Sequence, residues 1–128
     1  MAGTGGATGA RPPSDEMVTT IRIPTRPGQI KDVIAVLRSV VGPSLAQPSC
    51  RECDVVIDAI EDRYVLFHER WSSFQDFERH VRSDLYERVL SAMEMASEAP
   101  EVRFECMGRT WGLDLIRDVR LAREGAGD

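Results

Sequence analysis

The chain has 128 residues and a mass of 14.3 kDa, with 42% hydrophobic and 29% charged residues, which is enough for one globular domain and too little for two. Its 21 acidic and 16 basic residues give a net charge of -5 without a basic face, which excludes nucleic acid and anionic membranes as expected partners. No apolar stretch approaches the roughly 20 residues that span a bilayer, and no secretory signal pattern is present, so we expect a cytoplasmic protein.

The first sixteen residues, MAGTGGATGARPPSDE, differ in composition from the rest of the chain. They are mostly Gly, Thr, Ala and Pro and show no hydrophobic period, so they cannot offset the entropy that is lost on ordering. We therefore expect a disordered N-terminal arm over residues 1–16, one domain over 17–107 and a helical tail over 108–128.

A strand and a helix are predicted next. Residues 17–23, MVTTIRI, are rich in β-branched side chains and stop at Pro24, which predicts a strand. Apolar residues then recur at helical spacing as far as Gly42 and Pro43, which predicts that the helix ends there. These residues are Ile30, Val33, Ile34, Leu37, Val40 and Val41.

A hairpin and a second helix follow. Residues 53–60 and 63–71 flank a polar turn at Glu61 and Asp62, which predicts two antiparallel strands. Ser73 is placed to cap a helix on which Phe74, Phe77 and Val81 share one face.

The last third contains two more helical patterns and a strand. A helix opens at Ser83 and ends before Pro100, and residues 102–107 alternate as a fourth strand. Trp111, Leu115, Val119 and Ala122 recur at intervals of three and four, which predicts a tail helix from residue 111 to about 122. The order β-α-β-β-α-β with an appended helix is the signature of a ferredoxin-like α+β sandwich.

The predicted sheet needs cover on two faces. Its helices cover only one of them, yet the second and third strands carry apolar residues on both. We therefore expect a homodimer through the sheet face, because a second copy of the sheet supplies the missing layer. The apolar residues are Val55, Val56, Ile57, Ile60, Tyr64, Val65, Leu66 and Phe67.

Two stretches carry a resemblance to a known family. They are RPGQIKDVIAVLRSVVGPSLAQPSCRECDV, residues 26–55, and RYVLFHERWSSFQDFERHVRSDLYERVL, residues 63–90. Over residues 22–107, about two-thirds of the chain, their order and spacing resemble the antibiotic biosynthesis monooxygenase family of the dimeric α/β-barrel superfamily. The resemblance implies a homodimer whose sheets face each other and a cavity between the sheet and the helices of each monomer. The family includes cofactor-free oxygenases of quinol- or anthrone-like aromatics, heme-degrading enzymes and an isomerase-like branch.

Within that cavity the resemblance assigns catalysis to His80 and Trp71. His80 matches a histidine of many members, and an imidazole exchanges protons near neutral pH. Its other interpretation is a structural histidine that caps the core or bonds a neighbouring carbonyl. Trp71 matches a tryptophan that walls the cavity, although an ordinary core residue fits the position as well. We expect the substrate to contact Phe67, Glu69, Phe77 and Tyr86.

Glu69 and His68 have competing interpretations. Glu69 matches the family pattern, but a carboxylate beside Arg70 near a helix start is also typical of a structural partner for the backbone or an arginine. His68 has no matched counterpart in the family, and we expect it to face the opposing sheet of the dimer. A role in the dimer interface and a role in catalysis are equally open for it.

Two departures argue against particular branches of the family. Leu90 stands where heme-degrading members carry an axial histidine, so we expect no heme and no other cofactor. Phe67 stands where anthrone-type oxygenases carry an asparagine, so their substrate-polarising hydrogen bond is missing.

The three cysteines do not complete a recognised site. Cys50 and Cys53 have CxxC spacing, but no second pair supplies four ligands. Residues three apart in a regular strand point to opposite faces, which suits neither a disulfide nor chelation. We expect no bound metal, and we expect Cys50, Cys53 and Cys106 to be buried or half-exposed free thiols.

Two functions remain open. The first is a cofactor-independent monooxygenase acting on a small aromatic, quinol- or anthrone-like substrate. In it His80 is the general base and Trp71 lines the substrate cavity. The second is a non-catalytic dimeric domain that binds a small apolar molecule or supports another protein. The two differ in whether His80 and Trp71 open onto one shared cavity or pack against each other.

Overall fold

The computed structural model describes residues 15–58, 61, 63–106 and 108–126. The arm expected over residues 1–16 falls largely outside these ranges, as does Asp62 of the expected turn. Glu16 lies inside them, and its carboxylate pairs with Arg70 Nε at 3.0 Å. Glu16, directly before the first strand, therefore contacts the sheet through Arg70.

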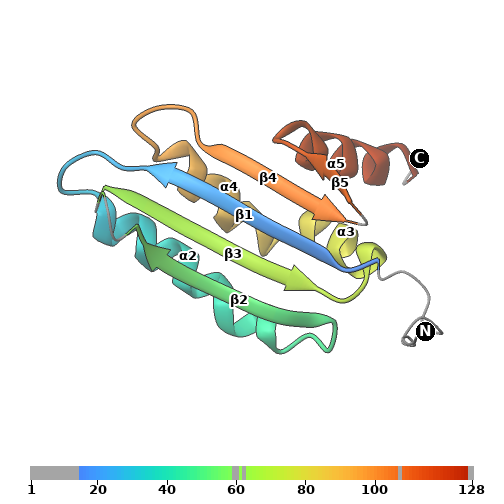
Figure 1. Ribbon diagram of the computed structural model, residues 1–128. Coiled ribbons are helices and arrows are strands. Elements are labelled where there is room, and N and C mark those ends of the chain that lie inside the picture. The colour runs from blue at the N-terminus through green and yellow to red at the C-terminus, as the bar shows by residue number, and fades with distance from the viewer. Residues whose placement is uncertain (1–14, 59–60, 62, 107, 127–128) are drawn as a thin grey trace, which may run out of the picture.

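The described residues form one antiparallel sheet of five strands in the order β2-β3-β1-β4-β5 (Figure 1). The first four strands have the order of a ferredoxin-like fold, which confirms the predicted α+β class. A short fifth strand, absent from the prediction, extends one edge. The strands are β1 Met17–Pro24, β2 Cys50–Ile57, β3 Tyr64–Trp71, β4 Glu101–Cys106 and β5 Arg109–Trp111.

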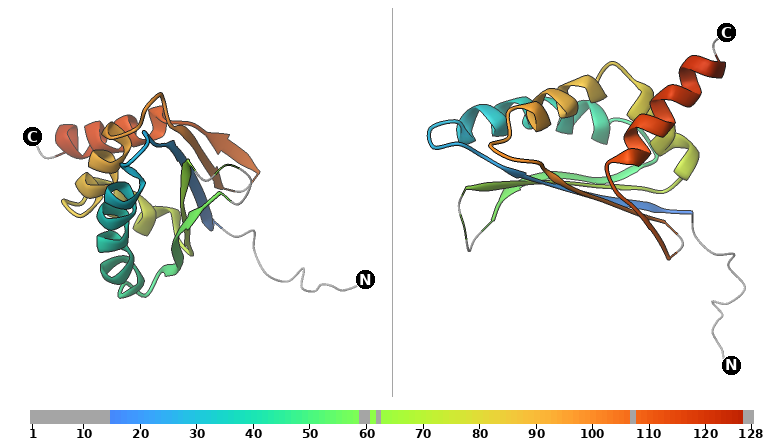
Figure 2. Two further views of the ribbon diagram at one scale, coloured as in Figure 1. Left: turned by 90° about the vertical axis from the view of Figure 1, so that its left-hand side faces the viewer. Right: turned by 90° about the horizontal axis from the view of Figure 1, so that it is seen from above.

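The described part of the chain forms four helices. They lie on one face of this sheet, as the edge-on view in Figure 2 shows. None of the helices within the described ranges is both long and apolar enough to cross a membrane. The helices are α2 Ile30–Leu45, α3 Phe74–Arg82, α4 Tyr86–Glu94 and α5 Asp114–Ala126.

Helix α2 continues through Gly42 and Pro43, so the predicted end of this helix is wrong. Proline has no N–H, and the carbonyl four residues before it loses its helical partner. That carbonyl belongs to Ser39, and it accepts a bond from Arg88 Nη1 of α4 at 3.3 Å. A tertiary contact thus replaces the hydrogen bond that Pro43 removes, and the helix continues.

Strand β2 contains an irregularity that changes the direction of its side chains. Cys50 pairs with Trp71 and Glu52 pairs with Arg70, so Arg51 is an extra residue in the ladder. As a result both Cys50 and Cys53 face the core, with 8% and 2% of their surfaces exposed. The expectation that these two cysteines face opposite sides is wrong.

Strand β3 alternates as predicted. Phe67, Glu69 and Trp71 are buried beneath the helices, whereas Leu66 and His68 lie half-buried on the opposite face. That opposite face carries fewer apolar groups than the sequence suggested, because Val65 and Phe67 point inward. Its aliphatic side chains on β2 and β3 are Val56 and Leu66, and charged pairs surround them.

The tail helix begins later than predicted. Trp111 belongs to β5, where its ring stacks on Phe74 with centroids 6.0 Å apart. Helix α5 starts at Asp114 and buries Leu115, Ile116 and Val119. It packs on α3 of the same domain.

Candidate functional site

Glu69 is a fully buried carboxylate at the centre of the covered sheet face. It pairs with Cys53 of β2 on one side and with Thr19 of β1 on the other. The Cys53 thiol lies 4.0 Å from Glu69 Oε2. These three inward positions form a polar row across an otherwise apolar surface.

His80 of α3 lies above this row. Ser73 caps the helix by accepting a bond from the Asp76 amide at 3.2 Å, and His80 falls on the buried face with Phe77. Its Nε2 is 2.7 Å from Glu69 Oε2, and neither side chain is exposed. The structure thus buries both side chains and pairs them, so the partner of Glu69 is His80 rather than the arginine or backbone group that was one of its two interpretations. The two atoms are in close contact, although their geometry is not that of an aligned hydrogen bond.

Two aromatic rings enclose the His80 imidazole. The Trp71 ring lies with its centroid 4.5 Å away and its plane tilted by 33°, and the Tyr86 ring meets it edge-on at 5.2 Å. Trp71 and Tyr86 are fully buried. We call Glu69, Trp71, His80 and Tyr86 the histidine cluster.

Several polar atoms around the histidine cluster have no hydrogen-bond partner although they are buried. A buried polar group left unpaired costs about 1–3 kcal/mol. A purely structural core would gain stability by replacing such residues with apolar ones, so these atoms favour a ligand-binding role. They are Thr19 Oγ1, Glu69 Oε1, Trp71 Nε1, His80 Nδ1 and Tyr86 Oη.

Burial keeps the neighbouring acidic groups protonated. Burial first, and the charge of Glu69 second, raises the pKa of Tyr86 well above its ordinary value, with a smaller opposing effect from Arg120. The same two causes raise the pKa of Cys50 to about 11 and that of Cys53 further. The phenol and both thiols are therefore donors at neutral pH, and neither thiol is an activated nucleophile.

The raised pKa of Cys50 predicts a loss of stability in alkali. The unfolded chain releases the thiol proton from about pH 9, whereas the folded chain keeps it to about pH 11, so the stabilisation is complete below pH 9 and disappears as the pH rises to 11. We expect the free energy of unfolding in urea to fall over this range, and to fall less steeply in Cys50→Ala. Equal slopes in the two proteins would contradict this assignment.

The other predicted site residues lie apart from the histidine cluster or at its edge. Phe77 makes its ring contacts with Phe74 and Phe104, at 6.2 and 5.5 Å. Phe67 is buried on the same face of β3 as Glu69, two residues earlier along the strand. His68 faces outward, as expected, and its Nε2 is 3.1 Å from Glu52.

Sequence reasoning missed Thr19 and Cys53. The signal for Thr19 was present, because strand alternation places it inward between Met17 and Ile21, where a hydroxyl is unusual. Cys53 was considered for metal binding and redox chemistry rather than as a neighbour of Glu69. Among the described residues no group of three or more His, Cys, Asp or Glu side chains is arranged to hold a metal ion.

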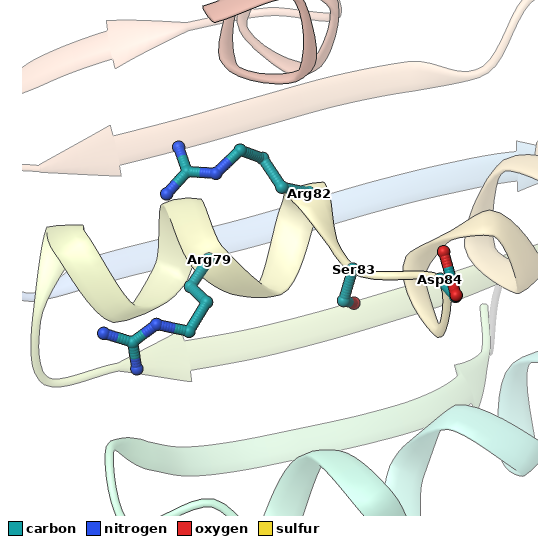
Figure 3. Close-up of a pocket in the computed structure, with 4 residues that line it drawn as sticks. All are labelled: Arg79, Arg82, Ser83 and Asp84. Carbon is teal, nitrogen blue, oxygen red and sulfur yellow. The ribbon is translucent and has the colours of Figure 1, made fainter. Parts of the chain in front are cut away.

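A surface pocket of about 290 Å³ lies at the junction of α3 and α4, where Arg79, Arg82, Ser83 and Asp84 line it (Figure 3). It is next to His80 along the chain, but the imidazole itself is only 1% exposed. The histidine cluster is therefore closed, with Trp71 and His80 in direct contact.

Comparison with known proteins agrees with the observed fold. A protein from Methanosarcina mazei Go1 superposes with a TM-score of 0.66 at 15% identity, covering 71% of this chain and 91% of its own. Rv0793 from Mycobacterium tuberculosis gives 0.64 at 21% identity, with 71% and 93% coverage, and PA3566 from Pseudomonas aeruginosa gives 0.63 at 21%, with 75% and 97%. None of the curated proteins compared with this chain matches it.

Residues 17–91 match the family described as antibiotic biosynthesis monooxygenase. The match spans more than half of the chain and includes all four residues of the histidine cluster. The chain therefore belongs to the antibiotic biosynthesis monooxygenase family.

Proposed function

We propose that the protein is a cofactor-independent monooxygenase of a small aromatic substrate, of the quinol or anthrone type, in which His80 accepts a proton with support from Glu69. The observation that carries the proposal is the buried contact of 2.7 Å between His80 Nε2 and Glu69 Oε2. Membership of the monooxygenase family supports the reaction class.

The chemistry needs no group beyond substrate, dioxygen and this pair. An activated methylene or a phenol gives its proton to His80, and the adjacent Glu69 carboxylate stabilises the imidazolium that forms. For a methylene, dioxygen then adds to the carbanion, and loss of water from the resulting peroxide leaves a carbonyl. The CH₂ group and O₂ thus become C=O and H₂O, and all the electrons come from the substrate.

The surrounding side chains favour an oxygen-bearing aromatic substrate. Trp71 Nε1, Tyr86 Oη and Thr19 Oγ1 are buried donors without partners, and they could bind the carbonyl or phenolate oxygen of such a molecule. The raised pKa of Tyr86 keeps its hydroxyl proton available for that bond. These donors could substitute for the family asparagine that Phe67 replaces.

One observation favours a second candidate, a non-catalytic dimeric domain that binds a small molecule or supports a partner. The Trp71 and His80 rings touch, and each side chain of the histidine cluster is at most 1% exposed. A substrate of aromatic size would have to separate these rings before it could reach the pair.

Oxygen uptake separates the two candidates. Metal-free protein without added flavin or heme is mixed with a panel of anthrones, quinols and catechols, and uptake is compared with autoxidation in buffer alone. We expect catalysed uptake with at least one member of the panel. If no member is consumed faster than in buffer while aromatic ligands still bind, the non-catalytic candidate replaces the monooxygenase.

The uncovered sheet face predicts a homodimer. Val56 is 48% exposed and pairs with Leu66 on that face. We expect sedimentation velocity at micromolar concentration to give twice the chain mass, with more than roughly 1,000 Å² buried in total. We expect Leu66→Glu to shift the protein towards monomer, whereas the control Leu121→Glu, on the exposed side of α5, leaves the mass unchanged. A wild-type monomer under these conditions would refute the prediction.

A further inference from the structure

Arg120 of α5 contacts both of the short helices that carry the histidine cluster. Its Nη1 donates to the carbonyl oxygen of Val81 at 2.6 Å, and its Nη2 lies 3.4 Å from Glu87 Oε2. Val81 follows His80 near the end of α3, and Glu87 follows Tyr86 in the first turn of α4. The Arg120 guanidinium thus contacts the residue that follows His80 and the residue that follows Tyr86.

The two helices depend on contacts from outside. Each has nine residues, and helices of this length are marginal on their own in water. The last carbonyls of a helix also lack partners within it. Ser83 satisfies the His80 carbonyl through its amide at 3.1 Å and its hydroxyl at 2.6 Å, and Arg120 satisfies the next carbonyl. A cation at this end of α3 is also favoured by the helix dipole.

Packing of α5 holds the guanidinium in place. Ile116 and Val119 are each 4% exposed, and the Arg120 side chain is 25% exposed. The planar fork of arginine makes two directed contacts at once, which a lysine ammonium does less well. Arg120 also lies beyond residues 17–91, the part of the chain that matches the family.

We propose that Arg120 is a positioning residue for the histidine cluster: by binding the Val81 carbonyl and Glu87 together, it fixes the junction of α3 and α4 and keeps the His80 ring between Trp71 and Tyr86. The charge of Arg120 also opposes the rise in the pKa of Tyr86, which agrees with its place beside the cluster. Any effect on turnover rests on the proposed monooxygenase function, whereas the effect on ring geometry does not.

Fluorescence tests the ring geometry without a substrate. The chain has two tryptophans, so Trp111→Phe leaves Trp71, whose contact with His80 makes its emission sensitive to the imidazole. In this background we expect Arg120→Gln to change the emission intensity and near-UV circular dichroism of Trp71. Arg117→Gln is the matched control, because Arg117 lies on the same helix with a side chain 66% exposed. Identical spectra for Arg120→Gln and its parent would overturn the proposal.

Glu87→Gln provides a second variant in case Arg120→Gln does not fold. The Glu87 side chain is 61% exposed, and its loss removes only one half of the bridge. We expect a smaller spectral change, and no change would overturn the bridging role.

Kinetics extend the test to the reaction. If oxygen uptake is found, we expect Arg120→Gln to lower kcat by on the order of 10- to 100-fold with little change in KM, because a displaced base slows chemistry more than binding. An unchanged kcat would overturn the positioning role in catalysis. Absence of uptake in the wild type would count against the monooxygenase function alone, and the spectra would still decide the role of Arg120.

Discussion

Replacing His80 with glutamine is expected to lower the turnover of aromatic substrates by about 10²- to 10⁴-fold, the usual contribution of one general base. Glutamine has a polar side chain that can remain near Glu69, but it cannot accept the substrate proton. The measurement is single-turnover oxygen uptake with a substrate identified in the panel. Retained activity in His80→Gln would keep the enzyme and remove this mechanism.

The burial of the pair determines which control is informative. The structure buries His80 against the buried carboxylate of Glu69. Removing one partner of such a pair typically costs 3–5 kcal/mol, because the remaining charge is left uncompensated. We therefore expect His80→Ala to be destabilised as well as inactive. The double variant Glu69→Gln with His80→Gln is the control, because it removes the charge and should recover stability without recovering turnover.

Removal of residues 108–128 is expected to lower the free energy of unfolding by at least about 3 kcal/mol. Leu115, Ile116 and Val119 are buried in the full chain, and each buried side chain of this kind contributes about 1.5–3 kcal/mol before the entropy of ordering the helix is subtracted. The truncation also exposes the surface of α3 that α5 covers. Urea unfolding of the full and shortened chains gives the difference.

The control for the truncation lies on the exposed side of the same helix. Leu121 is 53% exposed, so Leu121→Ser is expected to change stability by less than about 0.5 kcal/mol. A shortened chain that unfolds at the same urea concentration as the full chain would show that α5 adds nothing to the domain.

Local patterns predicted the elements and the direction of several side chains. The period of two along β3 is a property of any strand, so Phe67, Glu69 and Trp71 could be placed on one face before the helices above them were known. The helix after Ser73 follows that strand directly, and this kept His80 close to Trp71 in the prediction. The order of strands and helices then determined the fold class.

Contacts between distant elements could not be read in the same way. The Glu69–His80 pair depends on how closely α3 packs on the sheet, which no local pattern encodes. The extra residue at Arg51 leaves no clear mark in the sequence, yet it reverses the expected direction of Cys50. The rule that proline ends a helix failed at Pro43 because Arg88, 45 positions later along the chain, supplies a partner for the Ser39 carbonyl.

The extra residue in β2 also bears on how the protein avoids aggregation. Strand β2 is at the edge of the sheet, where free backbone groups could pair with a strand from another molecule. At Arg51 the regular spacing of those groups is interrupted, and a charged, exposed side chain occupies the interruption. An incoming strand would find no continuous row of donors and acceptors along this edge. We expect deletion of Arg51 to restore the regular spacing of backbone donors and acceptors along β2 and to make edge-to-edge strand pairing between molecules easier.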